Sequence, residues 1–394
     1  MTDPLLVLGL ALLALVVLAR AAQAVGQSVL PVYILFGVLV GPFGFGLGVL
    51  TVGVPLPTLL SLPAAVGVVL LLFFVGLELT VTDLLANRWA FARAGTVDVG
   101  ISLGLGALLG LAAGFSLLET AFLALVVFNS STAIVARSVL DFGWIGTPEG
   151  DAIFGLVVVE DLVTAGLFGV LSAVVGGGSG WSLAAALLAG LSFLVALTAV
   201  SLHGSDVVER AFRPLGSELF VLASLGATAV VGGLGVLTRT SEAVAAFLAG
   251  SVFRNAGLLP EAERYLAPVR DVFAVAFFVW VGVRTDPGVV GRVGPFIAVA
   301  SVVTLGGQVV SGYYAGRAFG LDPDGAVRMG TALTPRGEFS LVIAAFLATA
   351  GTTPILTEVI PAFTVGYVLV TSVVGSVLVR QADTLAAVRR RVWA

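Results

Sequence analysis

Two adjacent carboxylates, Glu160 and Asp161, lie between the apolar runs 156–159 and 162–163. An ionised carboxylate is costly in hydrocarbon, so at membrane depth it usually faces a bundle interior or a water-filled cavity and marks a pathway. Such a pair binds a proton and a monovalent cation in competition, because either one neutralises it. We therefore interpret Glu160 and Asp161 as an ion- and proton-binding site. The alternative is a helix end that reaches water.

Two further segments interrupt apolar sequence with polar or helix-breaking residues. The first is the run Asn129, Ser130, Ser131 and Thr132, whose side chains compete with helical backbone hydrogen bonds and can offer neutral oxygens to a cation. The second is the run Pro335, Arg336, Gly337 and Glu338, in which proline removes a donor and glycine loosens the backbone. One break in each half of a polytopic chain is typical of an inverted-repeat transporter. Taken singly, the breaks have plainer interpretations, a polar contact between helices and a simple kink.

Composition indicates which elements position these groups. Hydrophobic residues make up 59% of the chain and charged residues 11%, whereas a soluble domain has about 25% charged residues. Most of the surface must therefore face lipid, which predicts an all-α polytopic membrane protein. The net charge of -4 gives no nucleic-acid footprint, and the absence of cysteine excludes thiolate metal sites and disulfides. We expect no cofactor and no metal beyond a transported Na⁺ or K⁺.

Apolar runs of about 20 residues span a bilayer, and counting them predicts about thirteen spans. Asp3 is the only charged residue before the first run, and no basic residue precedes it. A cleaved secretory leader begins with positive charge, so we expect a retained membrane helix. The expected spans are 5–22, 29–50, 66–79, 97–115, 121–139, 152–175, 183–202, 219–237, 243–253, 272–283, 296–315, 327–350 and 355–379. Gly37 and Gly41 in the second span permit close helix packing.

Arginine placement predicts the orientation. Every basic residue is arginine, and an outward N-terminus puts most of these arginines on one side. Only Arg239, Arg284 and Arg292 fall on the other side, and Arg336 lies within a span. By the positive-inside rule the N-terminus is then outside and the C-terminus cytoplasmic, in a multi-pass cell-membrane protein.

Six short motifs, in order along nearly the whole chain, carry a resemblance to a known family. They are the stretches 36–42, 72–78, 130–135, 246–250, 277–282 and 335–339. With these motifs the chain resembles the monovalent cation/proton antiporters of the second group (CPA2), which include Kef-type and NapA-type exchangers. The resemblance implies the NhaA/NapA-like antiporter fold, with inverted repeats and two crossed broken helices.

The resemblance also implies a division of one exchanger domain, residues 1–394, into two bundles. A scaffold of residues 5–79 and 219–283 would form a homodimer, for which the small residues of the second span offer a contact face. A core of residues 97–175 and 296–379 would move against it in an elevator-type cycle, with 183–202 as a linker helix. No soluble regulatory domain, such as Kef-type members often carry, is expected.

At the site, the resemblance makes Asp161 the ion-binding aspartate. Glu160 departs from the pattern, since the preceding residue is Asp, Asn or Gln in known members. Electrogenic members have a lysine where Gln308 stands, and this chain has no lysine. Glu160 is then expected either to be held charged by Arg336 or to stay protonated, and both outcomes leave Asp161 as the single exchanging carboxylate.

Other charged residues have weaker roles. Asp98 and Glu78 are expected either to line a cytoplasmic entry funnel or to be ordinary interfacial residues, the second being favoured for Glu78. Arg336 and Glu338 are expected either to pair with each other or to contact the ion.

The sequence thus predicts a secondary antiporter that exchanges Na⁺ or K⁺ for H⁺, with an electroneutral cycle, and not an enzyme. Three alternatives stay open: a cation channel of the same architecture, a Kef-type K⁺ efflux protein, and an intramembrane aspartyl protease. The protease needs two carboxylates that face each other from separate helices, whereas Glu160 and Asp161 are adjacent in sequence.

Overall fold

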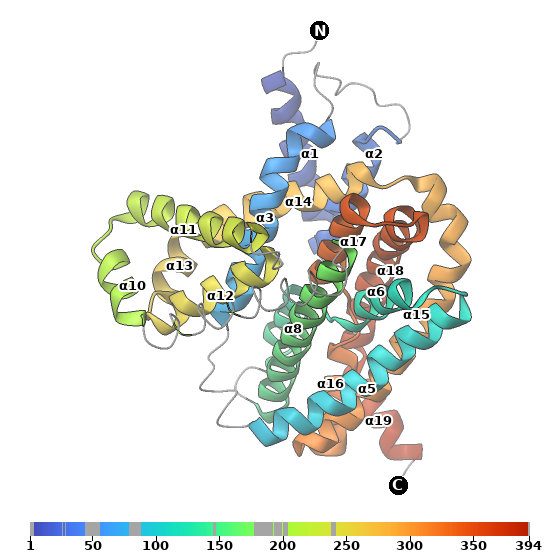
Figure 1. Ribbon diagram of the computed structural model, residues 1–394. Helices are drawn as coiled ribbons and strands as arrows, with labels where there is room; N and C mark the ends of the chain where they lie inside the picture. Colours follow the sequence, from blue (N-terminus) through green and yellow to red (C-terminus); the bar gives the residue numbers. More distant parts are fainter. Residues whose placement is uncertain are drawn as a thin grey trace. The chain divides into compact units, whose positions relative to one another are not determined.

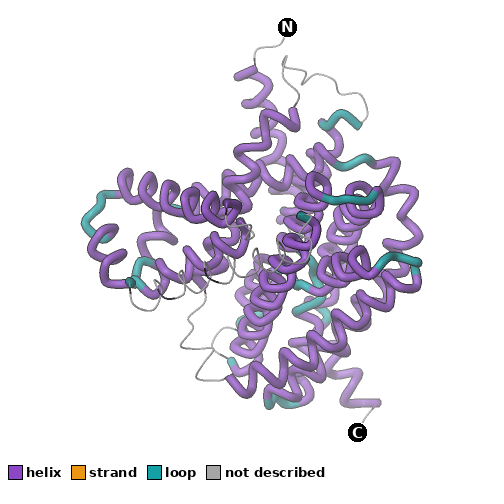
Figure 2. The backbone as a smooth tube through the Cα atoms, in the orientation of Figure 1, coloured by secondary structure: helices purple, strands orange, loops and turns teal. Residues whose placement is uncertain are grey.

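The computed structural model describes residues 4–25, 27, 29–43, 56–78, 88–144, 147–176, 192, 199, 204–237 and 242–392. These residues form helices joined by short loops, and none of them lies in a β-strand (Figure 1, Figure 2). The helices are α1 (Pro4–Ala24), α2 (Leu30–Val40), α3 (Leu56–Glu78), α5 (Arg88–Ala112), α6 (Leu117–Phe128), α7 (Thr132–Asp141), α8 (Pro148–Val175), α10 (Ser205–Phe212), α11 (Ser217–Leu237), α12 (Glu242–Asn255), α13 (Leu259–Tyr265), α14 (Ala267–Arg284), α15 (Pro287–Phe319), α16 (Pro323–Ala332), α17 (Glu338–Ala350), η2 (Ile355–Val359), α18 (Ile360–Arg380) and α19 (Ala382–Val392).

The chain divides into two compact units. Unit 1 comprises Met1–Val52, Ala86–Thr164 and Val281–Ala394, and unit 2 comprises Gly53–Leu85 and Ala165–Trp280. The carboxylate pair and both interrupted segments belong to unit 1. The predicted core and scaffold are defined by movement and not by contact, so that division stays a prediction.

Unit 2 is held by close backbone packing and by aromatic rings. A methyl group on Gly250 of α12 would lie 1.9 Å from the carbonyl oxygen of Phe73 in α3, so only glycine permits this approach. The rings of Phe73 and Phe253 meet edge to face at 5.0 Å, the arrangement that aromatic pairs prefer.

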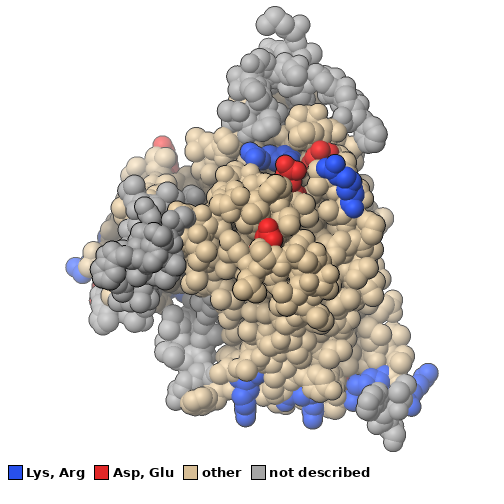
Figure 3. All heavy atoms as spheres, turned by 45° about the vertical axis from the view of Figure 1, so that its right-hand side comes forward, with Lys and Arg blue, Asp and Glu red and all other residues tan. Residues whose placement is uncertain are grey.

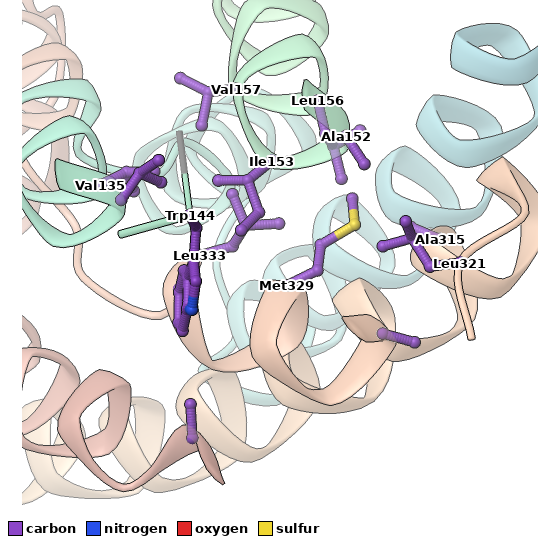
Figure 4. Close-up of a cluster of buried hydrophobic side chains, with 14 of the residues drawn as sticks. Val135, Trp144, Ala152, Ile153, Leu156, Val157, Ala315, Leu321, Met329 and Leu333 are labelled. Atoms are coloured by element: carbon purple, nitrogen blue, oxygen red, sulfur yellow. The ribbon is translucent and has the colours of Figure 1, made fainter. Parts of the chain in front are cut away.

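An apolar cluster in unit 1 joins α7, α8 and α16 (Figure 4). Its buried side chains include Val135 of α7, Ile153 and Leu156 of α8, and Leu333 just after α16. Leu156 lies four residues before Glu160, and residues at this spacing share a helix face. The cluster therefore holds the carboxylate pair toward both interrupted segments.

The two predicted interruptions occur in the structure. The expected span 121–139 is two helices, α6 and α7, separated by Asn129–Ser131. The expected span 327–350 is likewise two helices, α16 and α17, separated by residues 333–337. Each broken segment therefore presents two helix ends, with their unpaired backbone groups, inside the unit.

The second expected span, 29–50, is shorter in the structure. Helix α2 ends at Val40, and Gly41 adopts an extended conformation with ψ 172°. Pro42 explains this end, because proline disfavours the helical conformation of the residue before it. Residues 44–50 lie outside the described residues.

The small residues of α2 pack closely against helix α14 of the same chain. A methyl on Gly41 would lie 2.9 Å from the carbonyl oxygen of Val283 in α14, and one on Gly282 would lie 2.0 Å from that of Ile34. These small residues allow contact between α2 and the end of α14 within unit 1. They are therefore not the free dimer face that the sequence suggested.

Membrane-spanning length is satisfied by five described helices, within α5, α8, α11, α15 and η2–α18, and by a sixth if the bent pair α13 and α14 is one span. Shorter apolar helices include α2, α6 and α17. The expected linker helix, 183–202, lies outside the described residues except for positions 192 and 199. The total of about thirteen spans stays a prediction.

Charged side chains gather at the ends of the face drawn in Figure 3, and the wide belt between them is almost free of charge. A cluster of ion pairs ties α16 to the terminal helix α19. Arg328 contacts Glu149 at 2.7 Å and Asp383 at 2.9 Å, and Arg389 contacts Asp324 at 3.0 Å. An uncharged belt between charged ends fits a multi-pass membrane protein.

Candidate ion site

The two interrupted segments cross each other in unit 1. Ser130 and Arg336 form an isolated antiparallel bridge, in which the Ser131 N–H donates to the carbonyl oxygen of Pro335 at 2.8 Å. A methyl on Gly337 would lie 2.4 Å from Ser131 Oγ. The crossing therefore needs glycine at this position, and the Pro335 carbonyl pairs with the other segment.

The helix ends at the crossing are satisfied by side chains of the opposite segment. The carbonyl of Phe128, at the end of α6, accepts from Arg336 Nη1 at 2.6 Å. The carbonyl of Leu333, just after α16, accepts from the Ser130 hydroxyl at 2.8 Å. Ser131 Oγ caps α7 by accepting from the Ile134 N–H at 3.4 Å. A cation and hydroxyl donors at helix carbonyl ends complement the helix dipole.

Asp161 faces the first interruption. Its Oδ1 accepts from Asn129 Nδ2 at 2.9 Å, and its Oδ2 accepts from Thr132 Oγ1 at 3.2 Å. All three residues are buried, and Asn129 Oδ1 and Thr164 Oγ1 are buried oxygens without a hydrogen-bond partner. The surroundings of Asp161 thus offer neutral oxygens, a set that suits a partly dehydrated monovalent cation.

Glu160 faces Ser130. Its Oε2 accepts from the Ser130 N–H at 2.7 Å, and its Oε1 lies 3.1 Å from Ser130 Oγ. The Glu160 side chain is fully buried. The two adjacent carboxylates therefore contact different atoms of one interruption.

Arg336 is the largest fully buried side chain and reaches Gln308. Its Nη2 donates to Gln308 Oε1 at 2.7 Å, and its Nη1 also donates to Ser130 Oγ at 3.1 Å. Arg336 Nη1 and Glu160 Oε1 thus both lie within hydrogen-bond distance of the Ser130 hydroxyl. The two sequence expectations for Glu160, held charged by Arg336 or protonated, stay predictions. Helix α17 begins at Glu338, whose side chain lies outside the described residues, as does that of Glu78.

Asp98 does not line a solvent-exposed funnel, because its side chain is 0% exposed. Its Oδ1 accepts from Ser311 Oγ at 2.7 Å, and from Gln308 Nε2 and Ser102 Oγ at 3.1 Å each. Polar side chains from α5 and α15 surround it, which explains how a carboxyl is accommodated there. The sequence expectation for Asp98 is therefore corrected.

Two site residues, Ser102 and Ser311, were missed from the sequence. Ser102 lies four residues after Asp98, on the same face of α5, and the buried polar residues Ser301, Thr304, Gln308 and Ser311 repeat at helical spacing on α15. That polar stripe on an otherwise apolar helix was the available signal.

The site does not resemble a divalent-metal centre. Among the described residues, no group of three or more His, Cys, Asp or Glu side chains converges as metal ligands. Asp98, Glu160 and Asp161 instead hydrogen-bond to separate partners. The arrangement can hold protons or one monovalent ion at Asp161.

Comparisons with known proteins agree with this geometry. The family model described as "Sodium/hydrogen exchanger, transmembrane" matches residues 10–382. The chain is 29% identical to the K(+)/H(+) antiporter subunit KhtU of Bacillus subtilis, covering 98% of this chain and 95% of that one. It is 28% identical to the ammonium/H(+) antiporter subunit AmhT of Alkalihalophilus pseudofirmus, covering 90% and 87%.

A solved structure has the same fold. The sodium proton antiporter MjNhaP1 of Methanocaldococcus jannaschii superimposes with a TM-score of 0.73 over 98% of both chains, at 14% identity. At that identity the likeness concerns the fold alone. The named relatives are transporters and not enzymes, which excludes the protease alternative.

Proposed function

Because the chain belongs to the sodium/hydrogen exchanger family and is a CPA2-type antiporter, we propose that it exchanges a monovalent cation, Na⁺ or K⁺, for H⁺ across the cell membrane. The observation that carries the proposal is the Asp161 carboxylate facing the Asn129–Thr132 interruption. Relatives named for K⁺, ammonium and Na⁺ exchange support a monovalent cargo.

Asp161 is the group that binds the proton and the cation in turn. When ionised it binds the cation together with oxygens of Asn129 and Thr132, and when protonated it is neutral without the cation. Cation and proton therefore compete for one carboxylate, and only a neutralised carboxylate is inexpensive to carry through a low-dielectric interior. This competition couples the two fluxes in opposite directions.

Glu160 stays protonated through the cycle in this proposal. The Ser130 hydroxyl has one proton, and the Leu333 carbonyl at 2.8 Å accepts it. A proton on Glu160 Oε1 can then be donated to Ser130 Oγ, 3.1 Å away. A hydroxyl donates once and accepts twice, so a neutral Glu160 and the Arg336 Nη1 donor together satisfy it. One proton then exchanges for one cation, and the cycle is electroneutral.

The movement that exposes Asp161 to each side is an elevator-type displacement of the core, residues 97–175 and 296–379, against the scaffold. The two interrupted segments that meet at Ser130 and Arg336 support it, since transporters with discontinuous helices alternate largely by rigid-body motion around a fixed site. We also propose a homodimer, N-terminus outside and C-terminus cytoplasmic. The dimer is inferred from the family, and a monodisperse monomer by mass measurement in lipid nanodiscs would contradict it.

Proton flux in vesicles containing the purified protein tests the function. Na⁺, K⁺, Li⁺ and NH₄⁺ are added in turn, and a cation gradient is expected to drive opposite proton movement for at least one of them. Cation flux without coupled proton movement would instead identify the channel alternative.

A further inference from the structure

Asp98 is a buried carboxyl that the exchange mechanism above does not use. Side-chain donors of Ser102, Gln308 and Ser311 lie within hydrogen-bond distance of its Oδ1. The single Ser102 hydroxyl proton is shared between Asp98 Oδ1 at 3.1 Å and Gln308 Oε1 at 2.9 Å. Its Oδ2 is buried and has no hydrogen-bond partner. Burying a charge is costly unless an opposite charge compensates it, so Asp98 needs a positive partner.

Gln308 joins Asp98 to that partner. Its amide nitrogen donates to Asp98 at 3.1 Å, and its amide oxygen accepts from Arg336 Nη2 at 2.7 Å. A carboxylate only accepts and a guanidinium only donates, so this orientation of the amide satisfies both. Turning the amide over would set donor against donor and acceptor against acceptor. The pair of charges thus fixes the glutamine.

The charges around Asp98 are few. In the described part of unit 1, Arg336 attracts the Asp98 carboxylate. Asp98 would repel Glu160 if Glu160 were ionised, but in the proposed function Glu160 stays protonated and carries no charge. Arg336 also attracts Glu160, which lies behind the Ser130 hydroxyl. Two carboxyls therefore lie near one guanidinium, and Asp98 is the one that Gln308 links to it.

We propose that Asp98 is the counter-charge of Arg336, joined to it by Gln308, and that it acts as a positioning residue for the ion site. This inference rests on the proposed function. The linked pair is neutral, so Arg336 can brace the crossing through Phe128 and Ser130 without repelling a cation at Asp161. Without Asp98, the same guanidinium opposes cation binding.

A double-mutant cycle tests the proposal in the Glu160→Gln background, which removes the other carboxyl that Arg336 attracts. The four proteins are that background and its Asp98→Asn, Arg336→Gln and combined variants. Vesicle exchange gives the apparent KM for the cation. Asp98→Asn is expected to raise KM by roughly tenfold, within the usual range of coupling between neighbouring charges. Adding Arg336→Gln is expected to bring KM back toward the background value.

If Asp98 and Arg336 had only structural roles, the combined variant would lose the contacts of both residues, and its KM would be higher than that of Asp98→Asn. KM that stays raised or rises further in the combined variant overturns the proposal. Ser102→Ala is the matched control, since it removes a hydroxyl that contacts both Asp98 and Gln308 without removing charge. A KM change as large as that of Asp98→Asn would also overturn it.

Thermal unfolding of the same four proteins gives a second readout that needs no transport. Removing one member of a buried charge pair leaves the other uncompensated, whereas removing both is tolerated far better. The combined variant is therefore expected to unfold at a higher temperature than Asp98→Asn alone. If it unfolds at a lower temperature or fails to fold, the proposal is wrong. If the protein shows no exchange, the proposed function is wrong. The unfolding temperatures of the four proteins still test whether Asp98 and Arg336 are a charge pair.

Discussion

The two interrupted segments cross at one place but are built from different chemistry. Asn129–Ser131 supplies short uncharged side chains, and two of its residues hydrogen-bond to the carboxylate pair. Residues 333–337 supply a proline, a glycine and one buried arginine, which braces the carbonyl of Phe128. In the proposed mechanism the first interruption offers ligands to the cation, and the second offers a fixed charge and a fixed backbone. The two interruptions therefore have different roles in the proposed site.

The division explains why a buried arginine is compatible with a cation site. Arg336 donates hydrogen bonds to the Phe128 carbonyl, the Ser130 hydroxyl and the Gln308 amide oxygen. Asp161 accepts hydrogen bonds from the neutral side chains of Asn129 and Thr132. Substitutions in the two interruptions should consequently have different effects on exchange, cation affinity and stability.

Asp161→Asn should have the largest effect and abolish exchange in vesicles. Asparagine keeps the shape of the side chain but cannot alternate between a proton and a cation. The measurement is cation-driven proton flux, with size-exclusion chromatography to show that the variant folds. Substantial remaining coupled flux would remove Asp161 from the mechanism.

Gly337→Ala should come next, with lower thermal stability and reduced exchange. Its methyl would lie 2.4 Å from Ser131 Oγ, and such overpacking typically costs about 1–3 kcal/mol. Gly306→Ala on α15 is the matched control, because no heavy atom lies within 4 Å of the added methyl. Equal melting temperatures for the two variants would show that the crossing tolerates a wider separation.

Local sequence predicted the parts of the site that lie close together in the chain. Glu160, Asp161 and the Asn129–Thr132 run are visible because polar groups stand out within apolar segments. The interruption at Pro335–Gly337 is visible for the same reason, since proline and glycine act on their own backbone.

Contacts between distant segments could not be predicted in this way. Asp98 and Ser311 are separated by 213 positions, and they meet because α5 packs against α15. Arg336 had several candidate partners in the sequence, and its three acceptors depend on how the interruptions cross. The use of Gly41 against Val283 likewise follows from tertiary packing.

Thr132→Val should have a smaller effect, confined to the ligand side of the crossing. It keeps the volume but removes the oxygen that lies 3.2 Å from Asp161 Oδ2. We expect weaker apparent cation affinity with less change in the maximal rate. Thr228→Val in unit 2 is the control, because that hydroxyl bonds only to the carbonyl of Ser224 in its own helix. Unchanged affinity in Thr132→Val would make this stretch purely structural.

Glu160→Gln should have the smallest effect, because glutamine can replace a protonated glutamate as a donor to Ser130 Oγ. Exchange should be retained, with a shifted pH optimum, since Asp161 remains the only carboxyl that alternates between a proton and a cation. The decisive measurement is exchange under an imposed membrane potential, in the parent protein and in the variant. One proton for one cation moves no net charge, so the potential should leave both rates nearly unchanged. Strong driving of the parent by the potential would mean that two protons move per cation. Glu160 would then bind and release a proton in each cycle, as Asp161 does.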